Sequence, residues 1–168
     1  VEYVCGGQFY GDADITAYMD TWYGSKGVEI VFACGGGIYT SAAEAAAKVD
    51  GKVIGVDSDQ SGIIGEDITV TSAMKGLAPT VKTALTAIKD GKWDEYAGKI
   101  DNLGLVSENP EDNYVQLPME TTQWDDNFTV DDYKELVKKL YAGEIEVSND
   151  ITAMPKTEIT VNDYGSIK

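Results

Sequence analysis

Short apolar runs alternate with helical stretches along the first half of the chain. The runs are rich in β-branched residues and bounded by glycine or acidic residues, which is the pattern of strands, and they cover residues 1–6, 28–34, 52–60 and 66–75. The run at 28–34 is expected to be a strand buried on both faces. Helical stretches at 12–27 and 42–50 separate the runs. This alternation up to residue 89 predicts an α/β fold, a parallel sheet flanked by helices.

Capping residues and periodicity set the expected helix bounds. Asp12 or Asp14 can cap the first helix, which Gly24 or Gly27 would end. Ser72 is the predicted N-cap of the helix that follows the last apolar run. One face of that helix is predicted to be core, because its apolar residues recur at helical spacing. They are Met74, Leu77, Ala78, Val81, Leu85 and Ile88.

The pattern becomes polar and irregular after residue 91. Short β-like pieces occur at 99–106 and 114–117, and one more strand is expected at 159–161. Residues 130–145 predict an amphipathic helix with acids in its first turn, lysines in its last and Gly143 at its end. No repeat is present.

Composition narrows the functional classes. A chain of 168 residues with 43% hydrophobic content can bury one core. Its 13 basic residues are all lysine and face 29 acids, a net charge of −16, so no nucleic acid partner is expected. Histidine is absent, which removes the usual proton-transfer side chain and metal ligand, and no metal site is expected. Cys5 and Cys34 lack a CxxC spacing and are expected to be buried free thiols; a bridge stays open if the first two strands are neighbours.

The candidate site combines a glycine turn with a strand-end acid. Gly35, Gly36 and Gly37 follow the second strand, and Asp57 ends the third. Ligands of open parallel sheets bind outside the carboxyl ends of the strands, so both features face one expected cleft. A carboxylate there can accept hydrogen bonds from two adjacent hydroxyls, and Phe9, which follows the first strand, can stack on a flat ring. Further aromatic candidates are Tyr10, Trp22 and Tyr39.

Other interpretations of the same residues stay open. In one interpretation the glycine turn is a plain connection from strand to helix, and Asp57 is a surface or capping acid. This interpretation requires no ligand. The glycine turn and Asp57 have nearly the spacing of a dinucleotide fingerprint, with free N–H groups at the helix amino end, but Thr40 stands at the third glycine position. The acids of 57–60 also resemble the first motif of haloacid-dehalogenase-type phosphatases, with Ser61 where that family prefers Thr or Val. In that hypothesis Lys75 is the motif lysine, and Asp125 and Asp126 bind the metal.

Several segments together resemble the basic membrane protein family of purine-nucleoside-binding lipoproteins. The most specific are GVDSDQ and TSAMK, supported by QFYGD, VEIVFACGGG, SAAEAAAK, IDNLGLV and KKLYAGEIEV. The resemblance implies a type I periplasmic-binding-protein-like fold of two α/β lobes joined by hinge strands. Residues 1–90 would form a ligand-binding lobe, and residues 91–168 the hinge-crossing strands, amphipathic helix and tail.

The resemblance also implies a function and a set of site residues. The protein would be an extracytoplasmic, membrane-anchored component of an ABC transporter, not an enzyme, that closes on a nucleoside and delivers it to a permease. It would need no cofactor, and would meet the membrane only through an upstream lipid anchor that this chain lacks. Asp57 and Lys75 match residues that face the sugar, Phe9 an aromatic that flanks the base, and Gly35 and Gly36 the turn that approaches the ligand.

Two departures qualify the implied ligand. Relatives commonly carry small residues or Asn where this chain has Ile38 and Tyr39. A purine is favoured, and ring-plus-polyol ligands such as riboflavin stay open. A third alternative is a signalling or adhesion domain that has lost its ligand, with Tyr39 filling the cleft.

Overall fold

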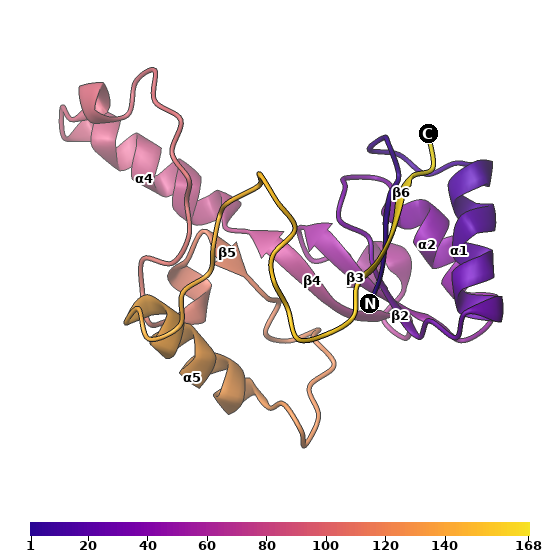
Figure 1. The fold of residues 1–168 in the computed structure, drawn as a ribbon. Coiled ribbons are helices and arrows are strands. Elements are labelled where there is room, and N and C mark those ends of the chain that lie inside the picture. Colours follow the sequence, from indigo (N-terminus) through magenta and orange to yellow (C-terminus); the bar gives the residue numbers. More distant parts are fainter.

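The computed structural model describes all 168 residues and contains five α-helices and six strands. The strands are β1 Glu2–Cys5, β2 Ile30–Phe32, β3 Lys52–Asp57, β4 Thr69–Lys75, β5 Val115–Gln116 and β6 Asn162–Ser166. The α-helices are α1 Ala13–Ser25, α2 Tyr39–Ala46, α3 Ser61–Ile64, α4 Leu77–Lys89 and α5 Val130–Tyr141. Figure 1 shows α4 and α5 at one end of the molecule and α1 and α2 at the other.

The main sheet has the order β2-β3-β4-β5. Its first three strands are parallel, and β5 is antiparallel to β4. Phe32 of β2 pairs with Ile54 of β3, and Asp57 pairs with Met74 of β4. The α/β class with parallel strands is therefore confirmed, although the sheet as a whole is mixed.

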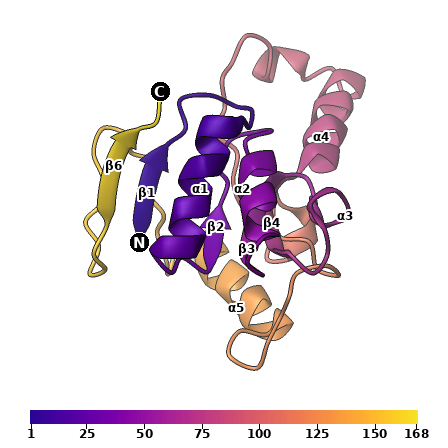
Figure 2. The ribbon, with the colours of Figure 1, turned by 90° about the vertical axis from the view of Figure 1, so that its right-hand side faces the viewer.

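The first strand lies outside this sheet. β1 pairs in parallel with β6, with Glu2 opposite Asn162 and Tyr3 opposite Asp163, and Figure 2 shows the two strands side by side at one edge. β6 begins at Asn162, after the strand predicted at 159–161. Because β1 and β2 are not paired, the condition for a bridge between the cysteines is not met.

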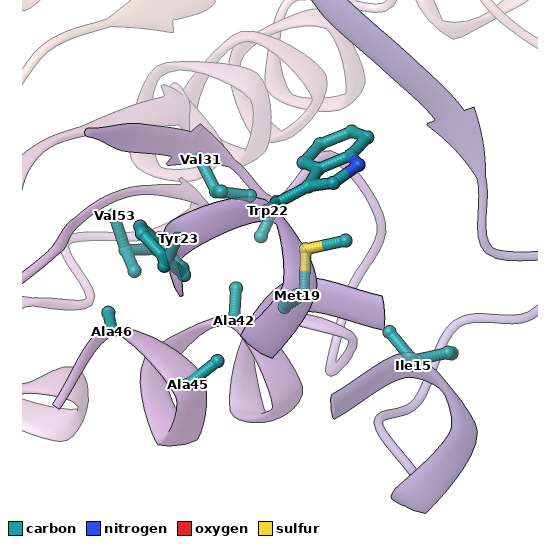
Figure 3. Packing of buried hydrophobic residues seen from close by; sticks show 10 residues of the cluster. Ile15, Met19, Trp22, Tyr23, Val31, Ala42, Ala45, Ala46 and Val53 are labelled. Atoms are coloured by element: carbon teal, nitrogen blue, oxygen red, sulfur yellow. The ribbon is translucent and has the colours of Figure 1, made fainter. Parts of the chain in front are cut away.

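Helices α1 and α2 cover one face of the main sheet and form the hydrophobic core with it. Small alanines of α2 let it lie close to α1 and β3, and the bulkier side chains of α1 fill the space between (Figure 3). The cluster comprises Ile15, Met19, Trp22, Tyr23, Val31, Ala33, Ala42, Ala45, Ala46 and Val53.

The opposite face of β2 is open, so the prediction of burial on both faces was wrong. Val31 points to the helices, whereas Ile30 and Phe32 are 47% and 52% exposed. Side chains alternate across a strand, so covering one face with helices leaves the neighbouring residues on the other. All three residues of β2 are apolar, but the helices cover only one side of the strand.

The prediction for α4 was wrong in two respects. Ser72 is not an N-cap: β4 continues to Lys75, Ser72 is buried within it, and α4 begins after Gly76. The expected core face is exposed, with only Ala87 of the helix buried. The α4 stripe, Leu77, Val81, Leu85 and Ile88, is 54% to 60% exposed. Helical spacing identifies an apolar face but does not say what packs against it, and α4 projects away from the sheet (Figure 1).

The two cysteines are free, as expected, but exposed, so the prediction that they are buried was wrong. Cys5 ends β1, and Cys34 lies just beyond β2. Their positions at the open strand ends, beyond the packed core, explain the exposure.

The second half contains one well-formed helix, α5. Thr129 and Asp132 form a reciprocal capping box at its start, and it ends before Gly143. Tyr133 and Val137 are its buried residues, and the Tyr133 hydroxyl accepts a hydrogen bond from the Leu117 N–H at 3.1 Å. Strand β5 falls within the predicted 114–117, whereas residues 99–106 form no strand.

No helix combines the length and apolar character needed to cross a bilayer.

Candidate functional site

Asp57 occupies a strained turn at the end of β3. Its φ is +70°, and the Ser58 N–H donates to the Val56 carbonyl across it at 2.8 Å. This pair of features defines a γ-turn with a left-handed central residue, a rare arrangement for a residue with a Cβ. Such strain persists only where the surroundings enforce it, and it clusters at functional sites.

The side chain of Gln60 enforces the turn. Its Oε1 accepts from the Val56 N–H at 2.9 Å, and its backbone N–H donates to Ser72 Oγ at 3.1 Å. This side chain lies across Gly55, where a Cβ would come within 2.7 Å of Gln60 Oε1. Glycine is therefore required in β3 for the buried glutamine to hold the turn.

The Asp57 carboxylate forms an ion pair with Lys75, the last residue of β4. Asp57 Oδ1 lies 2.6 Å from Lys75 Nζ, and the side chains are 43% and 68% exposed. The Asp57/Lys75 pair therefore keeps free carboxylate lone pairs and ammonium donors directed to solvent. In such a pair the carboxylate can accept a hydrogen bond from one hydroxyl of a diol, while the ammonium donates to the neighbouring hydroxyl.

Phe9 lies on the glycine turn. The Gly37 N–H donates to the Phe9 carbonyl at 2.8 Å, and Tyr10 forms a parallel bridge with Gly37. Gly36 has a φ of +53°, which favours glycine. A Cβ on Gly35 would lie 3.8 Å from the Phe9 ring. The ring is 77% exposed, so it contacts the turn and leaves its remaining surface free.

The two halves of the site lie beyond neighbouring strands. Gly35 and Asp57 are equally far past the paired residues Phe32 and Ile54 of β2 and β3. Parallel strands present their carboxyl ends at one edge of the sheet, so the glycine turn with Phe9 and the Asp57/Lys75 pair lie at the same edge. The structure thus brings Phe9 to Gly35 and Gly36, and Asp57 to Lys75.

Ile38 and Tyr39, which follow the glycine turn, pack toward the core. Ile38 contacts Gly6 and Gly35, and both Ile38 and Tyr39 pack against the hydrophobic core. Tyr39 therefore has a role in packing.

Two hollows of the molecule lie elsewhere. One, of about 420 Å³, is lined by Asp12, Asp20 and Glu44 between α1 and α2. Its polar groups are already paired: Glu44 accepts from Thr16 at 3.3 Å, and Asp20 is bonded to Lys48 at 2.9 Å. The other, of about 430 Å³, lies near Tyr23 and Asp50. Asp57 and Lys75 themselves are well exposed at the edge of the sheet.

The amino end of α2 is covered, which argues against a dinucleotide at the glycine turn. A Cβ on Gly11 would lie 2.2 Å from Thr40 Oγ1 and 2.9 Å from the Ser41 N–H nitrogen. The Asp12 N–H also donates to Ser41 Oγ at 3.0 Å. Backbone therefore occupies the place where a pyrophosphate would meet the helix.

The acids of the phosphatase hypothesis are dispersed. Asp59 accepts from Thr121 Oγ1 at 2.7 Å and the Ser61 N–H at 3.0 Å. Although partial burial opposes the effect, these hydrogen bonds lower the pKa of Asp59, whereas a general acid needs a raised pKa. Asp125 caps its own turn through the N–H groups of Asn127 and Phe128, which lowers its pKa. No three His, Cys, Asp or Glu side chains are grouped as metal ligands.

Comparisons with protein-family models and with curated proteins found no match for this chain.

Sequence reasoning missed the residues that hold the Phe9 loop, residues 6–12. Asp12, Gln8 and Lys168 form a hydrogen-bonded group at this loop. Only the capping role of Asp12 had a local signal; Lys168 is too distant in sequence for any pattern to reveal the contact.

Proposed function

We propose that this chain belongs to an extracytoplasmic solute-binding protein that encloses a nucleoside, with a purine base favoured, and delivers it to an ABC permease. The proposal is supported mainly by the exposed Asp57/Lys75 pair, which lies at the same sheet edge as the glycine turn that contacts Phe9. It supplies a site for the vicinal hydroxyls of a ribose and an aromatic surface for a base.

The chemistry of the pair suits a neutral, hydroxyl-rich ligand. The Lys75 ammonium offsets the Asp57 charge, so a neutral sugar meets an acceptor and a donor together. Charge-assisted hydrogen bonds of this kind contribute about 1.5–3 kcal/mol each. Phe9 would add stacking on the base.

A second lobe is supported by the unpartnered surfaces of this chain. The α4 stripe and the open face of β2 are apolar and exposed, and parallel sheets are normally covered on both faces. We assign the α4 stripe to the interface with a second lobe, which would close over the exposed edge at Asp57.

The connection between α4 and the sheet is narrow enough to act as a hinge. The chain passes to α4 through Gly76, where a Cβ would lie 2.2 Å from the Asn113 carbonyl oxygen of the returning segment. The Gly76 N–H also donates to the Tyr114 carbonyl at 2.8 Å. Two closely packed crossings of this kind allow lobes to close about few residues.

Calorimetry of the full-length protein tests the proposal. We expect heat of binding with inosine, guanosine or adenosine, and a roughly tenfold or greater loss of affinity for the 2′-deoxynucleoside. Asp57→Ala and Lys75→Met should each weaken binding, whereas Asp50→Ala, at the opposite end of β3, should not. Absence of binding with all three nucleosides, or unchanged affinity in Asp57→Ala, would contradict the proposal; riboflavin in the same panel tests the wider ligand class.

An activity assay separates binding from catalysis. Magnesium-dependent hydrolysis of p-nitrophenyl phosphate that disappears in Asp57→Asn would favour the phosphatase hypothesis instead.

A further inference from the structure

The last residues of the chain fold back onto the loop that presents Phe9. We call residues 162–168 the β6 strap. β6 lies parallel to β1, and the Ile167 N–H extends the pairing to the Cys5 carbonyl at 2.9 Å. The strap then passes over Gly7, where a Cβ would lie 3.2 Å from Lys168 Cβ. Figure 2 shows β6 beside β1 along this edge.

The strap makes an ion pair at the end of the Phe9 loop. Lys168 Nζ bonds to Asp12 Oδ2 and lies 3.6 Å from Asp14 Oδ2. Lys168 lowers the pKa of Asp12 to about 2, together with the Ile15 N–H and against slight desolvation. The pKa of Lys168 is raised in turn by Asp12, so both partners are charged at neutral pH.

Asp12 transmits this contact to the loop. Its Oδ1 caps α1 through the Ile15 N–H at 3.0 Å, and its Oδ2 also accepts from Gln8 Nε2 at 2.8 Å. Gln8 Nε2 bonds in addition to the Tyr10 carbonyl at 2.9 Å. The residues on either side of Phe9 are thereby tied to Asp12, and Phe9 itself is tied to Gly37.

The exposed ring of Phe9 depends on this backbone frame. Because most of the side chain contacts solvent, packing cannot fix its position, and the order of the loop must do so. We propose that Lys168 is a positioning residue, which holds the Phe9 loop against the glycine turn through Asp12 and so sets the place of the aromatic surface in the binding site.

Amide hydrogen exchange tests the strap without any ligand. In the full-length protein, Lys168→Met should speed exchange of the Gly37 N–H, which is bonded to Phe9, by about threefold to fivefold, the range of a surface ion pair. Lys168→Arg keeps the positive charge, so its Gly37 N–H should exchange as slowly as in the wild type. Lys139→Met, on α5 at the opposite end of the molecule (Figure 1), is the matched control. Equal Gly37 exchange in the wild type and Lys168→Met would overturn the inference.

Nucleoside affinity provides the second readout, which rests on the proposed function. The affinity of Lys168→Met should fall by a similar factor, whereas Lys168→Arg, which keeps the positive charge, should bind as the wild type does. If the wild type binds a nucleoside and Lys168→Met binds it equally well, the strap has no positioning role. If the wild type binds none, the proposed function fails, while the exchange measurement still decides whether the strap orders the loop.

Discussion

At the scale of single residues, the site depends on backbone conformations that the local side chains would not choose alone. Asp57 is one of two non-glycine residues with positive φ; the other is Asp50, at +57°. They stand at opposite ends of β3, and only Asp57 forms a turn held by a buried side chain, that of Gln60. A residue kept in a strained conformation where glycine would fit better indicates that its carboxylate matters.

Substitutions at Asp57 should separate stability from binding. Asp57→Gly should unfold at a higher urea concentration than Asp57→Ala, a difference of about 1 kcal/mol, because alanine pays a penalty at positive φ that exceeds the greater chain entropy of unfolded glycine. Both variants should lose nucleoside affinity.

The substitutions Asp50→Gly and Asp50→Ala are the control. The stability difference between glycine and alanine should recur there, without any change in affinity. A variant Asp57→Ala as stable as Asp57→Gly would show that the turn is unstrained.

At the scale of elements, similar amphipathic patterns lead to different burial. Helices α4 and α5 both carry an apolar face, but α5 buries Tyr133 and Val137 whereas the α4 stripe is exposed. An apolar face stabilises a fold only where another surface removes it from water.

Matched truncations measure this difference. Val137→Ala on α5 should lower the free energy of unfolding by about 2 kcal/mol, since it leaves a cavity in a packed contact. Val81→Ala on α4 should change it by less than about 0.5 kcal/mol. Urea unfolding of this chain checks both; a comparable loss from Val81→Ala would mean that the stripe is covered in solution.

The contact between β1 and β6 should be sensitive to acid. Hydrogen bonds from Tyr164 and Asn162, with Lys26, hold the pKa of Glu2 at about 2, below its ordinary 4.5. For Asp12, Lys168 does the same, to about 2 from 3.8. Since both folded pKa values lie below the unfolded ones, the stabilisation is complete above the ordinary pKa and is lost as the pH falls towards 2.

We therefore expect the β6 strap to detach as the pH falls from about 5 to about 2. The NMR signals of the Tyr164 ring, which lies 3.6 Å from Lys26 Nζ, report this contact. Glu2→Gln removes one of the titrating acids, so the Tyr164 signals of this variant should change less with pH. Tyr164 signals of the wild type that stay constant over this range would contradict the prediction that acid detaches the strap.

At the scale of the whole molecule, two features oppose stability: a large negative net charge and apolar surface that is exposed to water. A net charge of −16 on 168 residues gives strong self-repulsion, and the apolar α4 stripe and the open face of β2 are exposed at the same time. A further protein surface would remove both apolar areas from water.

Salt should stabilise this chain. The screening length falls from about 30 Å at 0.01 M to about 8 Å at 0.15 M ionic strength, which weakens the repulsion among the acids. We expect a gain on the order of 1 kcal/mol, or about 2–4 °C in Tm. Thermal unfolding in potassium chloride, with sucrose of equal osmolality as the control, measures the effect; a Tm that falls with salt would mean that surface ion pairs outweigh the repulsion.

The sequence by itself determined the local elements and the chemistry of the strand ends. Capping residues and apolar periodicity located α1 and α5, and glycine with β-branched residues located β2, β3 and the turn at residues 35–37. These signals are carried by residues within a few positions of one another, where backbone sterics and capping hydrogen bonds act directly. The position of Asp57 at the end of β3 was therefore predictable.

Only the tertiary structure decided which surfaces meet. The pairing of β1 with β6, the contact of Lys168 with Asp12, the exposure of the α4 stripe and the open face of β2 follow from no local pattern. Burial of an apolar face is favourable, but the face does not specify which surface covers it. An ion pair between residues at opposite ends of the chain forms only when the fold between them brings the two together. Local periodicity thus defines what each element offers, while the free energy of the assembled molecule selects its partner.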